Sequence, residues 1–205
     1  MSESLDLEHK FVDGADDTSP VLLLLHGTGG GQDDLVELAH TLSPTAALLA
    51  PSGPVSEHGM ARWFRRRAEG VFDYADVRRR ADQLAAFILA ARTAYDLADR
   101  RLLAVGFSNG ANIAAATVLL RPDALREAVL FAAMLPVPDP PQHDLTGSRV
   151  LLCNGRSDPM APVDSAIELV RLLSERSVEV TQRWHHGGHG ITEDGVAEAK
   201  KWLSG

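Results

Sequence analysis

The sequence predicts a single-domain α/β protein whose mostly parallel sheet is covered by helices on both faces. Short apolar runs alternate with helical patterns along most of the chain, which is typical of this class. The run Val21–Leu25 is apolar throughout, as expected for a strand buried on both faces. Distinctive residues directly follow such runs, at 26–31, Ser108, Asp158 and His189. Ligands bind at the carboxyl ends of the strands in such sheets, so we expect one site there.

Length, composition and net charge indicate what class of protein this is. The chain has 205 residues, with 45% apolar and 23% charged residues, which suits one domain over 1–205 with a peripheral segment at 1–20. The net charge of −8 argues against a nucleic-acid partner, and no apolar run is long enough to span a membrane. Cys153 is the single cysteine and lies in an apolar run, so we expect a buried strand residue and no internal disulfide. Without a secretory signal, a cytoplasmic location is expected.

The first half of the chain begins with strands and short helical patterns. Residues 7–12 predict a short edge strand, and an aspartate-rich turn follows it. After Val21–Leu25, a helix is expected over 32–42, with two aspartates near its amino end. A short apolar strand over 46–50 ends at a turn of Pro, Ser and Gly.

The next two segments differ in their periodicity. Residues 53–72 carry several Gly and Arg residues, and we expect a loop there. Residues 73–95 place their apolar side chains on one face of a helix. That face consists of Val77, Leu84, Phe87, Ile88 and Ala91.

An apolar strand that begins at Leu102 runs into GFSNG at 106–110, and an Ala-rich helical pattern follows. This G-x-S-x-G pattern between a strand and a helix is typical of a nucleophile elbow. The serine occupies a strained turn, and a side chain two residues before or after it would collide with neighbouring elements. The pattern therefore presents the Ser108 hydroxyl at the carboxyl end of the strand and near the positive end of the helix.

The second half continues the alternation of strands and helices. The patterns predict strands over 128–133, 149–153 and 178–184, helices over 162–175 and 192–203, and a proline-rich loop over 136–142. The short connection between Ala133 and Arg149 leaves no room for a large lid domain.

A serine hydroxyl needs a base to become a nucleophile, and the base needs an orienting acid. The order Ser, acid, His in such a fold selects Ser108, Asp158 and His189. Asp164 and Asp144 are rival acids, but the first lies at or in a helix and the second precedes its strand.

His185 and His186 are the rival bases. Both follow directly on the strand, whereas glycines flank His189 and give its loop more freedom, which favours His189. The three histidines also cluster, but no matched cysteines or H-E-x-x-H motif accompany them, so no metal or other cofactor is expected.

The tetrahedral intermediate of acyl transfer needs two preorganised donors. The backbone N–H of Asn109 directly follows the nucleophile, and the Gly-rich loop at 26–31 offers the N–H of Thr28. A phosphate cradle is the rival interpretation of this loop, but neither a Gly-Lys-Ser/Thr ending nor G-x-G-x-x-G is present.

These motifs together resemble one family from about Val21 onward. LHGTGG at 25–30, GFSNGAN at 106–112, GRSDP at 155–159 and GGH at 187–189 are similar to the phospholipase/carboxylesterase family of the α/β-hydrolase fold, which includes the acyl-protein thioesterases. GMARWF at 59–64 is similar to the bacterial small carboxylesterases, including the hydroquinone-resistance type.

The resemblance implies a three-layer fold with about seven strands. It implies Ser108 as nucleophile, Asp158 as acid, His189 as base, and Thr28 and Asn109 as oxyanion donors. The chain departs from the acyl-protein thioesterases at Asn109, where they usually carry Gln, but the backbone donor is unaffected.

Three functions follow from this pattern. A serine carboxylesterase acting on small or medium acyl esters through an acyl-enzyme is favoured. A lysophospholipase or acyl-protein thioesterase and a non-catalytic ligand-binding member of the fold are the alternatives.

The expected partner is a small-molecule ester, and a homodimer through an exposed apolar patch is left open. The expected wall of an open, shallow pocket is Gly27, Met60, Trp63 and Phe64, although the last three could equally be core residues.

Overall fold

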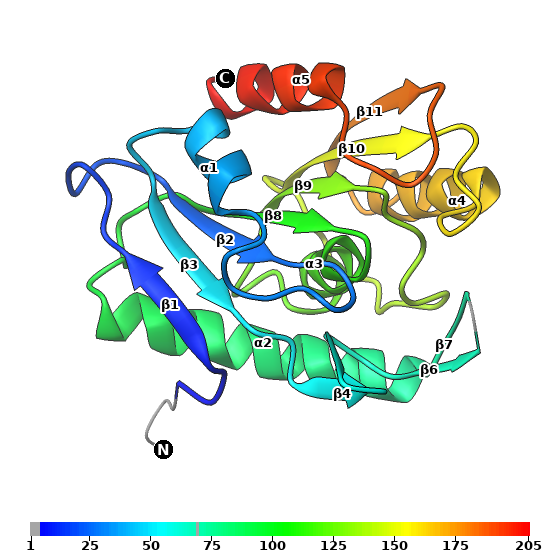
Figure 1. Ribbon diagram of the computed structural model, residues 1–205, viewed down its shortest axis with the longest axis horizontal. Helices are drawn as coiled ribbons and strands as arrows, with labels where there is room; N and C mark the ends of the chain where they lie inside the picture. The colour runs from blue at the N-terminus through cyan, green and yellow to red at the C-terminus, as the bar shows by residue number, and fades with distance from the viewer. Residues whose placement is uncertain (1–4, 69) are drawn as a thin grey trace.

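The computed structural model describes residues 5–68 and 70–205 (Figure 1). Within these ranges, seven strands form one sheet in the order β1-β3-β2-β8-β9-β10-β11. β1 pairs antiparallel with β3, and the other neighbours are parallel. The strands are β1 (His9–Val12), β2 (Val21–Leu25), β3 (Ala47–Pro51), β8 (Leu102–Phe107), β9 (Glu127–Phe131), β10 (Arg149–Gly155) and β11 (Glu179–His185). The helices are α1 (Val36–Leu42), α2 (Tyr74–Ala94), α3 (Asn109–Leu120), α4 (Val163–Ser174) and α5 (Glu193–Leu203).

The helices cover both faces of the sheet and give it two separate cores. Residues of α2, α3 and α4 pack in one core, and residues of α1 and α5 pack in the other, in agreement with Figure 1. Alternate side chains of β2 enter opposite cores, with Leu23 in the first and Leu22 and Leu24 in the second. Because both faces of the strand are buried, its sequence is apolar without alternation.

Two helices begin at side chains that accept a hydrogen bond from the first turn. Asp73 accepts from the N–H of Asp76 at the start of α2, and Thr192 accepts from the N–H of Gly195 at the start of α5. These two helices begin within one residue of the positions that the sequence predicts, because their caps are local features.

The structure corrects two of the expected elements. Residues 53–72 contain two small hairpins, β4 (Val55–Glu57) with β5 (Met60–Arg62) and β6 (Arg66–Ala68) with β7 (Val71–Phe72), rather than a loop alone. Strands of two or three residues are too short to produce a visible periodicity. The helix expected over 32–42 begins only at Val36, because residues 32–35 form turns.

The residues described at the amino-terminal end contribute to the main sheet through β1. Phe11 in this strand stacks on Tyr95, with ring centroids 4.1 Å apart, and His9 Nε2 lies 2.7 Å from the Tyr95 hydroxyl. β1 is therefore held against the end of α2 as well as against β3.

Candidate active site

Ser108 lies at the turn between β8 and α3, with φ 53° and ψ −115°. Positive φ is rare for a residue other than glycine and marks a strained backbone that the surrounding structure maintains. A Cβ at Gly110 would lie 1.9 Å from the carbonyl oxygen of Leu25, and one at Gly106 would lie 2.7 Å from the carbonyl oxygen of Gly110. Only glycine at these two positions allows β8, β2 and α3 to approach closely enough to form the turn.

Three side chains form one chain of hydrogen bonds. The Ser108 Oγ lies 2.8 Å from His189 Nε2, and His189 Nδ1 lies 2.7 Å from Asp158 Oδ2. The second oxygen of Asp158 accepts the N–H groups of Met160 and Ala161, at 2.8 and 3.0 Å. The Asp158 carboxylate is fully buried and has protein partners on both oxygens, so its direction relative to the imidazole is fixed.

The three residues come from turns that follow parallel strands. Ser108 follows β8, Asp158 lies in the turn after β10, and His189 lies in the loop after β11. β10 and β11 are adjacent, and Gly155 pairs with His185 at the carboxyl ends of both strands. The N–H of Ser157 then donates to the carbonyl of Gly187 at 3.2 Å, which joins the two loops.

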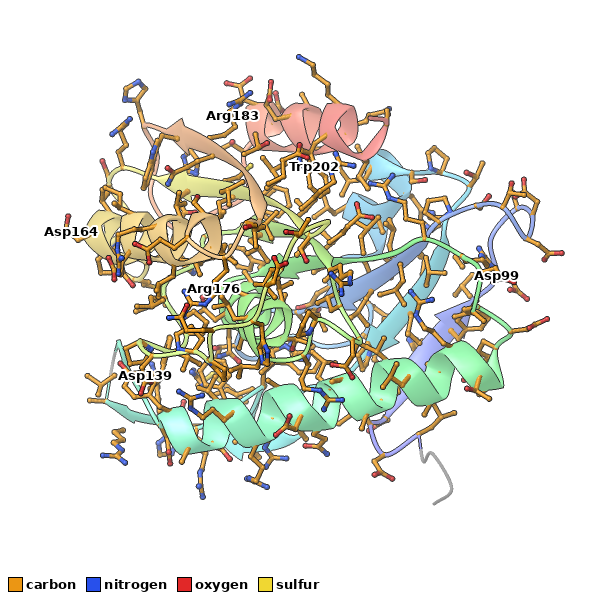
Figure 2. All side chains as sticks on the ribbon, turned by 180° about the vertical axis from the view of Figure 1, so that it is seen from behind. Asp99, Asp139, Asp164, Arg176, Arg183 and Trp202 are labelled. Atoms are coloured by element: carbon orange, nitrogen blue, oxygen red, sulfur yellow. The ribbon has the colours of Figure 1, made fainter. Side chains whose placement is uncertain are left out.

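The rival acids and bases occupy other places. Asp164 is exposed on α4, and Figure 2 shows it at the outer end of that helix. Asp144 is exposed and caps its own turn through Thr146. His185 belongs to β11 and accepts from the N–H of Gly187, and His186 is exposed. The structure therefore brings together the acid and base that the order of the motifs selects.

The N–H groups of Thr28 and Asn109 have no hydrogen-bond partner within the described part of the chain. The loop that carries Thr28 is anchored from the β4–β5 hairpin and the residues after it. The Trp63 indole donates to the carbonyl of His26 at 2.9 Å, and the N–H of Gly29 donates to the carbonyl of Ala61 at 2.9 Å. Arg62 Nη1 also donates to the Thr28 hydroxyl at 3.0 Å. These contacts hold the loop beside the elbow.

A cavity of about 40 Å³ opens beside Ser108 and His189, but its wall differs from the expected one. Trp63 and Phe64 are 1% and 0% exposed and belong to the main core, so these two assignments to the pocket are wrong. Gly27 lies against the Phe107 ring, and Met60 lies beside Gly29; neither is among the described residues that line the cavity. Besides Thr28, Ser108, Asn109 and His189, the wall includes Arg62, Arg66, Phe72, Asn112, Met134 and Met160.

Only some of the residues that line the cavity could be predicted from the sequence. Asn112 follows Ser108 by about one helical turn within the elbow motif, so its proximity could have been foreseen. Arg62 and Arg66 lie on short hairpin strands that no periodicity revealed. Met160 follows Asp158 in the same turn, where its N–H also holds the carboxylate.

No group of three or more His, Cys, Asp or Glu side chains in 5–68 and 70–205 is arranged to hold a metal ion. Over the same ranges, no helix has the length and apolar character needed to cross a bilayer. Cys153 is buried in β10, and burial raises the pKa of its thiol to about 12.

Comparison with known proteins agrees with this geometry. Residues 8–205 match the phospholipase/carboxylesterase family. The protein named hydrolase MhqD of Bacillus subtilis (strain 168) is 38% identical over 196 residues, which cover 96% of this chain and 97% of that protein.

Two solved structures named as carboxylesterases are also similar. The Bacillus cereus carboxylesterase is 39% identical, with a TM-score of 0.94 over 97% of this chain and 94% of that one. A carboxylesterase from Mesorhizobium loti is 31% identical, with a TM-score of 0.90 over 97% and 95%. The chain therefore has the α/β-hydrolase fold without an evident large lid in the residues described, belongs to the phospholipase/carboxylesterase family, and is a carboxylic ester hydrolase.

Proposed function

We propose that the protein is a serine carboxylesterase that hydrolyses esters of small to medium acyl groups through an acyl-enzyme. Ser108 is the nucleophile, His189 the general base and acid, and Asp158 the residue that orients His189. The observation that carries the proposal is the continuous hydrogen-bond chain from Ser108 Oγ through both nitrogens of His189 to the buried Asp158 carboxylate.

In the first half of the reaction, the Ser108 oxygen attacks the ester carbonyl carbon while His189 Nε2 takes the hydroxyl proton. The carbonyl oxygen becomes negatively charged and accepts hydrogen bonds from the N–H groups of Thr28 and Asn109. The carbon–oxygen bond to the alcohol then breaks, and the imidazolium gives its proton to the departing alcohol. Asp158 stabilises the imidazolium through Nδ1–H throughout this step.

In the second half, a water molecule attacks the acyl carbon and gives its proton to His189. The bond to the Ser108 oxygen breaks, the serine recovers the proton, and the free acid leaves. A cavity of about 40 Å³ supports a short acyl group, because longer chains would extend beyond its wall.

The test is the intact mass of the protein after exposure to a fluorophosphonate, which reacts with activated serines. We expect one adduct on the wild type, none on Ser108→Ala and a much slower reaction on His189→Ala. Ser157→Ala is the matched control, because Ser157 is an exposed serine in the same turn as Asp158. Absence of an adduct on the wild type would contradict the proposal and favour a binding protein.

A panel of esters of increasing acyl length then separates the related functions. Highest kcat/KM on short acyl groups supports the carboxylesterase, whereas a steady rise toward long acyl groups would favour a lysophospholipase or thioesterase.

A further inference from the structure

The cavity beside Ser108 has an apolar part, formed by Phe72, Ala132, Met134 and Met160, and a polar part formed by cationic and donor groups. Arg62 from β5 and Arg66 from β6 line it together with His189. None of the described residues that line it carries a carboxylate. A wall of this composition favours a ligand with several negatively charged acceptor atoms over an apolar one.

Two asparagines on the wall are each oriented by a backbone group. Asn109 Oδ1 accepts the N–H of Trp63 at 2.7 Å, and Asn112 Oδ1 accepts the N–H of Met134 at 2.9 Å. Because each oxygen is occupied in this way, the amide nitrogen is the end that remains to bind something else. These residues are 3% and 5% exposed, and the Asn109 Nδ2 group is buried without a partner.

A buried donor without a partner destabilises a protein unless a ligand or water satisfies it. The Asn109 amide, which is buried without a partner, and the oriented Asn112 amide beside it therefore point to a ligand rich in acceptors. They also distinguish this cavity from a simple apolar acyl pocket, where unpaired donors would only weaken binding.

The two arginines are held rigidly at the wall. Arg62 is buried, and its Nε and Nη1 donate to the carbonyl of Phe64 and the hydroxyl of Thr28, at 3.3 and 3.0 Å. Glu57, outside the cavity wall, pairs with both arginines: Arg66 Nε lies 3.2 and 3.1 Å from its two oxygens, and Arg62 Nη1 lies 3.5 Å from Oε2. The two guanidinium groups therefore share one acidic partner and keep a net positive charge between them. A planar guanidinium that is already fixed in position loses little entropy when it binds a carboxylate.

We propose that this cavity selects esters that carry a second, free carboxylate within a few bonds of the ester group, such as half-esters of small dicarboxylic acids. The inference rests on the proposed function, since it assigns the substrate class of the same site. The free carboxylate binds Arg66, Arg62 and the Asn112 amide, while the N–H groups of Thr28 and Asn109 receive the ester carbonyl.

The test compares esters that differ only in the charge of one group. Monomethyl succinate and methyl succinamate place a carboxylate or its neutral amide on the acyl side. Acetoxyacetate and acetoxyacetamide place the same two groups on the alcohol side of the ester. In at least one pair, we expect kcat/KM to be about tenfold or more higher for the anion than for the neutral amide, mainly because KM is lower. Equal or lower values for the anion in both pairs would overturn the inference.

Two variants test the residues assigned to the carboxylate. Asn112→Asp keeps an oxygen for the Met134 N–H but replaces the amide donor by a charged oxygen, so we expect it to reverse the preference. Arg66→Gln should reduce the ratio of kcat/KM for the anion to kcat/KM for the amide about tenfold. Arg67 lies on the same strand but outside the cavity wall, so Arg67→Gln should keep the wild-type ratio. Wild-type ratios in both Asn112→Asp and Arg66→Gln would overturn the inference.

Failure of this inference is distinguishable from failure of the proposed function. If the fluorophosphonate labels Ser108 and the neutral esters are hydrolysed without preference for the anion, only the substrate class is wrong. If no adduct forms and neither member of either pair is hydrolysed, both proposals are wrong.

Discussion

Ser108 combines a strained backbone with a hydroxyl directed at an imidazole, and each feature has a different origin. The positive φ belongs to the short turn between β8 and α3, which packs closely against the end of β2. The hydrogen bond to His189 joins residues 81 positions apart, so it depends on the order of strands in the sheet. The local feature is visible in the sequence motif, and the long-range contact is only implied by it.

Asp158→Asn is the sharpest test of the orienting acid. The asparagine retains the size of the side chain but cannot stabilise the imidazolium, and we expect kcat to fall by about 10⁴-fold with little change in stability. Steady-state kinetics on a short-chain ester measure this. Asp164→Asn, which changes an exposed rival acid on α4, should retain wild-type kcat. Similar losses in both variants would remove Asp158 from the proposed mechanism.

At the scale of single elements, the elbow depends on two glycines that no other residue can replace. We expect Gly110→Ala to lower the free energy of unfolding by about 3 kcal/mol, because its Cβ would overlap the Leu25 carbonyl. Gly190→Ala is the control, since nothing lies within 4 Å of the added carbon, and it should change stability by less than about 0.5 kcal/mol. Urea unfolding measures both, and equal stability of the two variants would refute the steric account of the elbow.

The start of α2 depends on Asp76, whose side chain is fully buried. Burial alone would raise the pKa of this carboxyl, but the hydrogen bonds from the Arg65 N–H and the Arg79 guanidinium lower it below its usual value. Because the pKa is lowered in the folded protein, the ionised group stabilises the fold above the pKa of the unfolded chain. This stabilisation is lost as the pH falls through the folded value.

We therefore expect Asp76→Asn to lower the free energy of unfolding by about 1–3 kcal/mol near neutral pH. The difference from the wild type should shrink as the solution is acidified, and urea unfolding at several pH values measures it. Asp82→Asn is the control, since Asp82 lies on the same helix but is exposed beside Arg121. A difference that grows in acid would have the wrong sign for a lowered pKa.

At the scale of the whole molecule, the two cores meet at a sheet whose inner strands are buried on both faces, namely β3, β2, β8, β9 and β10. Cys153 lies in β10 within the core that α5 covers, and Figure 2 shows Trp202 of that helix facing the sheet. Cys153 is 2% exposed at the base of a cavity of about 200 Å³, and burial raises the pKa of its thiol to about 12, so we expect this thiol to react very slowly in the folded protein.

We expect iodoacetamide to leave the native protein unmodified at about pH 8 over hours and to modify it fully in urea, as read by intact mass. The modification rate in the native state should rise with the fraction of molecules in which the fold is open, as a low concentration of urea increases that fraction. Rapid modification under native conditions, without loss of structure, would show that the β10–α5 interface opens locally.

The sequence by itself determined the layout of the molecule and the identity of the central residues. Continuous apolar runs define doubly buried strands, the spacing of apolar side chains defines the helix over 73–95, and the elbow motif points to Ser108, because each depends on residues close together in the chain. The choice of Asp158 and His189 required one further rule, the chain order of serine, acid and histidine in such a fold.

Only the tertiary structure decided the wall of the cavity. The sequence left Trp63 and Phe64 open as pocket or core residues. The structure buries both in the core, while Arg62, Arg66 and Asn112 line the cavity. Short hairpins carry the two arginines, and their position depends on contacts with Thr28, Phe64 and Glu57 rather than on any local pattern. An apolar side chain near a motif can pack into the core or face a ligand. Which of the two occurs depends on the elements that pack against it, and only the folded structure shows them.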